Sequence, residues 1–174
     1  MGFKKVAVLG YYYGGCIALE YTLRFLEHLG HLILLESVPN SDYWEEVKAN
    51  AWGKGAAQEQ LDALEASADN EEEFWHLLKL TEPLYFYTYD ADLAERVLGK
   101  TIVNVEASEA GGAIQEGWDL IPRLSEISVP TLVLVGKDDF ICPPSQAKIM
   151  HERIPNSELV IFVRPVKSGT FVTC

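Results

Sequence analysis

The sequence predicts an α/β fold with a mostly parallel sheet and an inserted helical segment. Short, continuous apolar runs at residues 6–9, 32–35 and 131–135 are typical of strands that are buried on both faces of a parallel sheet. The stretch 39–117 is acidic and aromatic-rich, has a helical period and contains no good strand candidate. We therefore predict a core made of residues 1–38 and 118–174 and a helical cap at residues 39–117.

Composition and charge narrow the class of protein. The chain has 174 residues, of which 48% are hydrophobic and 23% charged, as in a folded, water-soluble domain. Its 26 acidic and 14 basic residues give a net charge of −12, which repels nucleic acid phosphates and anionic lipids. We expect no nucleic acid and no membrane partner. A small-molecule or short-peptide ligand and a homo-oligomer stay open.

The cysteines and histidines show no metal or disulfide pattern. Cys16, Cys142 and Cys174 form neither a CxxC pair nor an even set, which favours a reducing compartment. The four histidines lack a ligand spacing such as HExxH, so surface or helix-end roles are favoured over metal binding. We expect a cytoplasmic protein with no metal and no cofactor.

The first crossover unit can be read from its periodicity. The apolar residues Ile17, Tyr21, Phe25 and Leu29 recur every fourth position, which predicts a helix over residues 16–29 that stops at Gly30. Strand, helix and strand joined in this way form a right-handed parallel crossover. Because ligands bind at the carboxyl ends of such strands, function should lie near residue 10 and just after residue 35.

Later elements follow from capping and proline signals. Asn70 and Asp90 are predicted N-caps of two helices in the acidic region. Pro143 and Pro144 precede a predicted helix that runs to Arg153, and residues 158–163 are the last predicted strand.

The segment 8–15, VLGYYYGG, has the layout of a nucleophile elbow, G-x-S-x-G, between a strand and a helix. Gly10 and Gly14 flank the central position, where a side chain on either would strike the neighbouring strand or helix, and Gly15 follows. Tyr12 stands where the serine nucleophile is expected. The alternative is a glycine-rich turn with no chemistry.

Two segments, 6–39 and 129–144, together resemble the α/β-hydrolase superfamily, especially its proline-iminopeptidase-like branch. They bracket the helical insertion, where that family carries its cap, and cover roughly the second half of a family member. The resemblance implies a partial α/β-hydrolase fold. It also implies serine-type acyl-transfer hydrolysis of amide or ester bonds.

The resemblance assigns roles to individual residues. Asp139, in Gly-x-x-Asp at a strand end, matches the triad acid, and Tyr12 occupies the nucleophile position. Thr170 occupies the histidine position, because Ser-Gly-Thr-Phe at 168–171 matches Ser-Gly-His-Phe. Only the amide of Tyr13 carries over to the oxyanion hole, since an HGGPG-like loop does not occur in the 174 residues.

These replacements predict impaired hydrolysis. A threonine is not a base near neutral pH, and a phenol, with an ordinary pKa of about 10, stays protonated there. A tyrosine nucleophile is the less favoured alternative. The other alternative is a non-catalytic pseudo-hydrolase that binds a small ligand or another protein.

The cap contributes weaker candidates. Its aromatic residues would line an apolar pocket or, more simply, pack the cap. The resemblance suggests that cap carboxylates such as Glu106 or Glu109 hold a substrate amino group, although a solvated acidic face is the simpler interpretation. Cys16 is predicted to be a packing residue, and Cys142 lies near the predicted acid.

Overall fold

The computed structural model describes residues 2 and 4–163. These residues divide into two compact units. The core unit holds the described residues up to Asp42 together with residues 117–163, and the helical unit is Tyr43–Glu116. The role of the helical unit as a cap stays a prediction.

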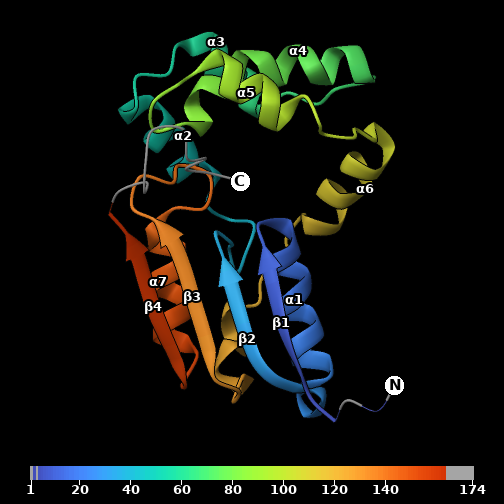
Figure 1. Ribbon diagram of the computed structural model, residues 1–174, viewed down its shortest axis with the longest axis vertical. Coiled ribbons are helices and arrows are strands. Elements are labelled where there is room, and N and C mark those ends of the chain that lie inside the picture. The colour runs from blue at the N-terminus through green and yellow to red at the C-terminus, as the bar shows by residue number, and fades with distance from the viewer. Residues whose placement is uncertain (1, 3, 164–174) are drawn as a thin grey trace. The chain divides into compact units, whose positions relative to one another are not determined.

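The core unit contains a fully parallel sheet, as the sequence predicts (Figure 1). Within the described residues it has four strands in the order β1-β2-β3-β4. The strands are β1 (Val6–Tyr11), β2 (Leu29–Leu35), β3 (Thr131–Gly136) and β4 (Ser157–Phe162).

The strand register places the carboxyl ends of the first three strands side by side. Tyr11 lies opposite Leu35, and Leu35 lies opposite Leu134. The residues that directly follow β1 and β2, and the loop that follows β3, therefore leave the sheet at one edge. This edge is where parallel α/β sheets bind ligands.

The helix after β1 differs from the prediction in its bounds. Helix α1 spans Tyr13–Arg24 and is followed by the short 3-10 helix η1 (Leu26–His28). Phe25 ends α1 because its backbone leaves the helical region, with φ −135° and ψ 43°. The predicted stop at Gly30 is wrong, since that glycine lies inside β2, where fully buried Leu29 begins the strand.

The main hydrophobic core lies between one face of the sheet and two helices, α1 and α7 (Pro144–Arg153), which Figure 1 shows behind the strands. The 3-10 helix η3 (Ile121–Glu126) joins them through buried Leu124. Alternate strand residues supply the sheet side of this core, as the period of two requires. They include Leu32, Leu34, Val133 and Val135.

The helical unit is built from capped, acidic helices. Its elements are α2 (Trp44–Gly53), α3 (Gln58–Glu65), α4 (Glu71–Thr81), η2 (Glu82–Tyr85), α5 (Ala91–Leu98) and α6 (Val105–Gln115). The predicted N-caps are confirmed: the side chains of Asn70 and Asp90 accept hydrogen bonds from the amides of Glu73 and Leu93.

A buried carboxylate joins three elements of the helical unit. Glu82, 4% exposed, accepts a short hydrogen bond from the Tyr89 hydroxyl and pairs with the Lys79 ammonium at 3.1 Å. Lys79 also reaches Glu95 on α5. Lys79 of α4 thus pairs with both Glu82 of η2 and Glu95 of α5, and these bonds offset the cost of burying the Glu82 carboxylate.

Candidate functional site

The turn between β1 and α1 has the strained geometry of an elbow. Tyr12, its central residue, has φ 53° and ψ −121°, a region that side chains other than glycine rarely occupy. Its amide donates to the Leu35 carbonyl at 3.1 Å, and its own carbonyl accepts from the Gly15 amide at 2.8 Å. The Tyr12 side chain remains 40% exposed.

Glycine is needed at two positions of this turn. A Cβ on Gly10 would lie 2.5 Å from the Gly14 carbonyl oxygen and from the Gly15 Cα. A Cβ on Gly15 would lie 2.0 Å from the Ser37 hydroxyl oxygen. The steric argument for Gly14 is wrong, because a Cβ there would meet nothing within 4 Å. The close approach falls one residue later, where α1 packs against the end of β2.

Two residues just after β2 complete this edge, Glu36 and Ser37. Buried Ser37 donates a hydrogen bond of 3.0 Å from its hydroxyl to the Tyr12 carbonyl oxygen. Glu36 has φ 46°, and among the described residues other than glycine a positive φ occurs there and at Tyr12. Tyr12 directly follows β1 and Glu36 directly follows β2, so a strained residue lies just after each of these two neighbouring strands.

Glu36 is also electrostatically unusual. Loss of water around its half-buried side chain raises the pKa of the Glu36 carboxyl from 4.5 to about 7. The group therefore changes charge near neutral pH. Perturbed carboxyl groups gather at functional sites, so Glu36 is a candidate member of this one.

Asp139, the predicted acid, follows β3 and is 2% exposed. Its Oδ1 accepts hydrogen bonds from the amides of Ile141 and Cys142, at 3.0 and 2.8 Å. Two amide donors hold the carboxyl group in one orientation. The assignment of Asp139 as the acid of a triad stays a prediction.

Of the other two residues with a predicted role, Tyr13 lies within the described residues and Thr170 does not. Tyr13 is the first residue of α1, so its amide is one of the four at a helix start that lack an intrahelical acceptor. Thr170, at the predicted histidine position, lies outside the described residues. The structure thus brings Tyr12, Tyr13, Asp139 and the glycines to one edge of the core unit.

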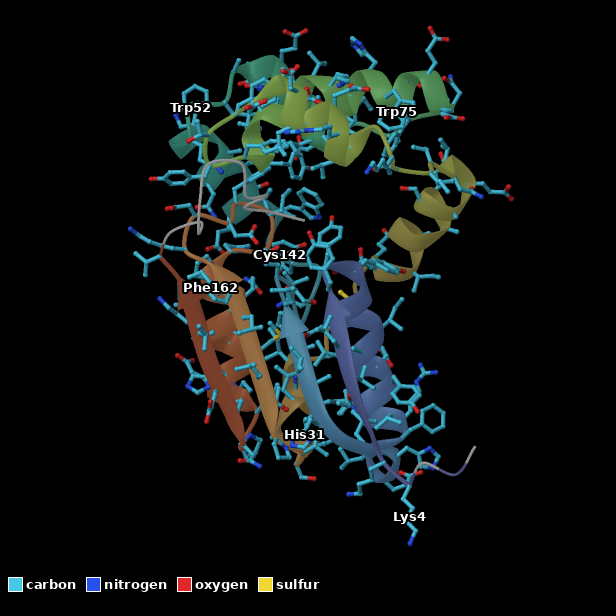
Figure 2. All side chains as sticks on the ribbon, in the orientation of Figure 1. Lys4, His31, Trp52, Trp75, Cys142 and Phe162 are labelled. Atoms are coloured by element: carbon cyan, nitrogen blue, oxygen red, sulfur yellow. The ribbon has the colours of Figure 1, made fainter. Side chains whose placement is uncertain are left out.

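Two cysteines, Cys16 and Cys142, are buried near this edge. Cys16, 7% exposed, directs its sulfur toward the Val38 carbonyl oxygen at 3.7 Å, in keeping with its predicted packing role. Cys142 is 1% exposed, and Figure 2 shows it just beyond the carboxyl ends of the strands. His31 lies in β2 at the opposite end of the sheet.

The described residues contain neither a membrane span nor a metal-ligand cluster. No helix in that range is both long and apolar enough to cross a bilayer. No cluster of three or more His, Cys, Asp or Glu side chains there could hold a metal ion.

The sequence indicates the region after residue 35, and Glu36 and Ser37 lie in the segment that carries the family resemblance, but the sequence assigns neither residue a role in the site. The available signal was two polar residues directly after a buried apolar run, at the edge where ligands bind. The positive φ angles of Tyr12 and Glu36 and the hydrogen bond from Ser37 to Tyr12 cannot be predicted from any pattern in the sequence.

A family comparison accounts for this combination of parallel sheet and strained elbow. The family model described as alpha/beta hydrolase fold matches residues 1–169. The chain belongs to the α/β-hydrolase family.

The chain is similar to curated proline iminopeptidases and methyl ester esterases. A proline iminopeptidase from Thermoplasma volcanium is 30% identical over 174 aligned positions, which cover 92% of this chain and 58% of that protein. Proline iminopeptidase PfmaB from Pestalotiopsis fici is 27% identical over 165 positions, which cover 91% of this chain and 59% of that protein. A pimeloyl-[acyl-carrier protein] methyl ester esterase from Hamiltonella defensa is 31% identical over 156 positions, which cover 88% of this chain and 58% of that protein.

Solved structures show the same fold. An esterase from Exiguobacterium antarcticum superposes with a TM-score of 0.69 at 24% identity, covering 92% of this chain and 59% of that one. MenH from Staphylococcus aureus gives a TM-score of 0.61 at 23% identity, covering 97% and 61%. The chain therefore spans less than two thirds of the length of these proteins.

Proposed function

We propose that this chain carries the acyl-transfer site of proline iminopeptidases and related esterases in a form that no longer performs serine-type hydrolysis. The observation that carries the proposal is the identity of Tyr12 at a strained elbow. An elbow presents one side chain to the substrate. In this chain that side chain is the phenol of Tyr12, where a serine hydrolase has the hydroxyl of serine.

The chemistry of the triad supports the loss of activity. In a serine hydrolase, a histidine removes the serine proton, and an aspartate orients that histidine. This chain has Asp139 where the aspartate is expected, but Tyr12 and Thr170 at the other two positions. Because triad members act as a unit, two replacements leave little for the third to contribute.

A second candidate function is a non-catalytic site that binds a small molecule or a short peptide. The retained strain at Tyr12 favours it, because strain of about 1–3 kcal/mol persists only where the surroundings enforce it. The bond from Ser37 and the tight packing of Gly15 hold the elbow in place, and the Tyr12 side chain is 40% exposed.

Hydrolysis of p-nitrophenyl acetate and of proline p-nitroanilide tests the first proposal. We expect no saturable turnover by the unmodified chain, by Tyr12→Phe or by Tyr12→Ser, because serine alone has no base. Adding Thr170→His to Tyr12→Ser supplies that base, and any activity gained should appear in this double variant. Saturable turnover by the unmodified chain that Tyr12→Phe abolishes contradicts the proposal.

A further inference from the structure

Two exposed tryptophans follow one flank of α2 in the helical unit. Trp44 and Trp52 are 42% and 63% exposed, whereas Val47 and Ala51 on the inner side of the same helix are fully buried. Trp44, Lys48 and Trp52 follow one another at intervals of four residues, so they lie along one flank of the helix. Figure 2 shows Trp52 at the margin of the helical unit. We call Trp44, Lys48 and Trp52 the α2 stripe.

Exposed tryptophans at this spacing are typical of a surface that binds another molecule. Tryptophan is enriched among the residues that contribute most to binding at protein interfaces. Tyr43 stacks on Trp44, with ring centroids 6.0 Å apart and ring planes 14° apart. This contact restrains the Trp44 ring before any partner binds, which lowers the entropy lost on binding.

The charge of the helical unit indicates the chemistry of the partner. Residues 43–116 hold 16 of the 26 acidic residues of the chain and 5 of its 14 basic residues, a net charge of −11 against −12 for the whole chain. Two of these basic side chains, Lys48 and Lys79, each pair with two carboxylates of the same unit. An excess of one sign attracts a partner of the opposite sign, so the partner of the α2 stripe should be basic.

Lys48 shows how the stripe holds a cation. Its ammonium nitrogen lies 2.6 Å from a carboxylate oxygen of Glu45 and 2.8 Å from one of Glu65. Hydrogen bonds to these two carboxylates raise the pKa of the Lys48 ammonium above its ordinary value. The Glu45 side chain is 91% exposed and the Glu65 side chain 52%, so a second cation can reach both. Arginine suits this surface better than lysine, because its planar guanidinium can stack on an indole ring while its N–H groups bind carboxylates.

The same charge disfavours a second copy of the chain as the occupant. Two copies, each with a net charge of −12, repel each other at neutral pH. Glu45 and Glu46, in the first turn of α2, would also bring like charges together if two α2 stripes met.

We propose that the α2 stripe binds an arginine-bearing segment of another polypeptide, with guanidinium groups stacked on Trp44 and Trp52 and hydrogen-bonded to Glu45 and Glu65. The interface lies within the helical unit and is independent of whether Tyr12 supports any chemistry. It gives the chain a protein-binding surface in addition to the elbow.

Fluorescence anisotropy of labelled octa-arginine, titrated with the 174-residue chain at low salt, tests the proposal. We expect a Kd below about 100 µM. Octa-lysine should bind about 3-fold more weakly or worse, because an ammonium stacks less well on an indole, and octa-glutamate should not bind. Trp52→Ala should weaken octa-arginine binding by about 5-fold, through the loss of one cation–π contact. The control Ile102→Ala alters a side chain that is 96% exposed in the same unit and should leave binding unchanged.

Lys48→Ala is a second test, because it removes the cation that pairs with Glu45 and Glu65. It should tighten octa-arginine binding by about 3-fold, since both carboxylates become available to guanidinium groups. Lys100→Ala is the matched control: it changes the net charge by the same amount at an exposed position outside α2 and should tighten binding less.

Three results overturn the proposal. One is the absence of octa-arginine binding at about 100 µM of the chain, the range of a very weak interaction. Another is binding that Trp52→Ala, with an unchanged circular dichroism spectrum, leaves as tight as before, which assigns it to net charge alone. If Trp52→Ala does not fold, equal effects of Lys48→Ala and Lys100→Ala overturn the proposal instead. The third is a homodimer of the chain that Trp52→Ala dissociates, which assigns the α2 stripe to a second copy.

Discussion

The Ser37 hydroxyl donates a hydrogen bond of 3.0 Å to the carbonyl oxygen of Tyr12 and so joins the end of β2 to the turn between β1 and α1. Ser37 is also the residue against which Gly15 packs. One buried serine thus holds both the strained residue and the start of the helix that follows it. The elbow geometry depends on its neighbour strand as well as on its own glycines.

Removing this hydroxyl should destabilise the core unit. We expect Ser37→Ala to lower the free energy of unfolding by about 1–2 kcal/mol, because the Tyr12 carbonyl loses a donor. Urea denaturation measures the change. Ser125→Ala is the control, since this exposed serine in η3 should shift stability by less than about 0.5 kcal/mol. Equal effects of the two substitutions would show that the bond contributes nothing.

Adjacent glycines should respond in opposite directions to alanine. Gly15→Ala should cost about 2–3 kcal/mol, because its Cβ would lie 2.0 Å from the Ser37 hydroxyl oxygen. Gly14→Ala should be neutral or stabilise by up to about 1 kcal/mol, because there is space for a Cβ and alanine favours a helix. Thermal unfolding of both variants tests this contrast. A destabilised Gly14→Ala beside an unaffected Gly15→Ala would refute the packing described for α1.

Glu36 should make stability fall as the pH rises. Its pKa is raised from 4.5 to about 7 in the folded chain, so between these values the folded state binds more protons than the unfolded state. The stability that this group contributes is complete below pH 4.5 and is lost as the pH passes 7. Glu36→Gln keeps the side chain neutral and should therefore stabilise the protein at pH 8, by about 1–2 kcal/mol after allowance for its partial exposure.

Urea unfolding of Glu36→Gln and the unmodified chain at pH 5 and pH 8 measures the difference. Glu152→Gln, at an exposed position in α7, is the control and should show no such pH-dependent difference. A Glu36→Gln effect of the same size at both pH values would contradict the raised pKa.

Asp139 should be needed for the loop after β3. Asp139→Ala removes the acceptor of two amide hydrogen bonds and should cost about 2 kcal/mol or more. Asp139→Asn retains an oxygen at the Oδ1 position and should lose less than half of that amount. Differential scanning calorimetry compares the two variants. If asparagine and alanine destabilise equally, then the two amide bonds do not hold this loop.

The parallel sheet could be predicted from sequence because its signals are local. Apolar runs at residues 6–9, 32–35 and 131–135 identify buried strands without any knowledge of their neighbours. The N-caps Asn70 and Asp90 are similarly local and were found at the expected residues. The end of α1 was predicted wrongly, because Leu29 has the spacing of a helical residue but is the buried first residue of β2.

The site was predictable in position but less so in its residues. The spacing of Gly10, Tyr12 and Gly14 located the elbow, but the steric need for glycine lies at Gly10 and Gly15. The need at Gly15 arises from Ser37, twenty-two residues away in sequence, and no local pattern reveals it. The raised pKa of Glu36 likewise comes from burial in the folded chain.

Intact-protein mass spectrometry after incubation with a fluorophosphonate probe tests most directly whether the elbow still supplies a nucleophile. The account predicts no adduct on the unmodified chain, because its elbow carries the Tyr12 phenol with no histidine base, and an unchanged mass for Tyr12→Phe. A single stoichiometric adduct that peptide mapping places on Tyr12, and that is absent from Tyr12→Phe, would contradict the account and establish a tyrosine nucleophile.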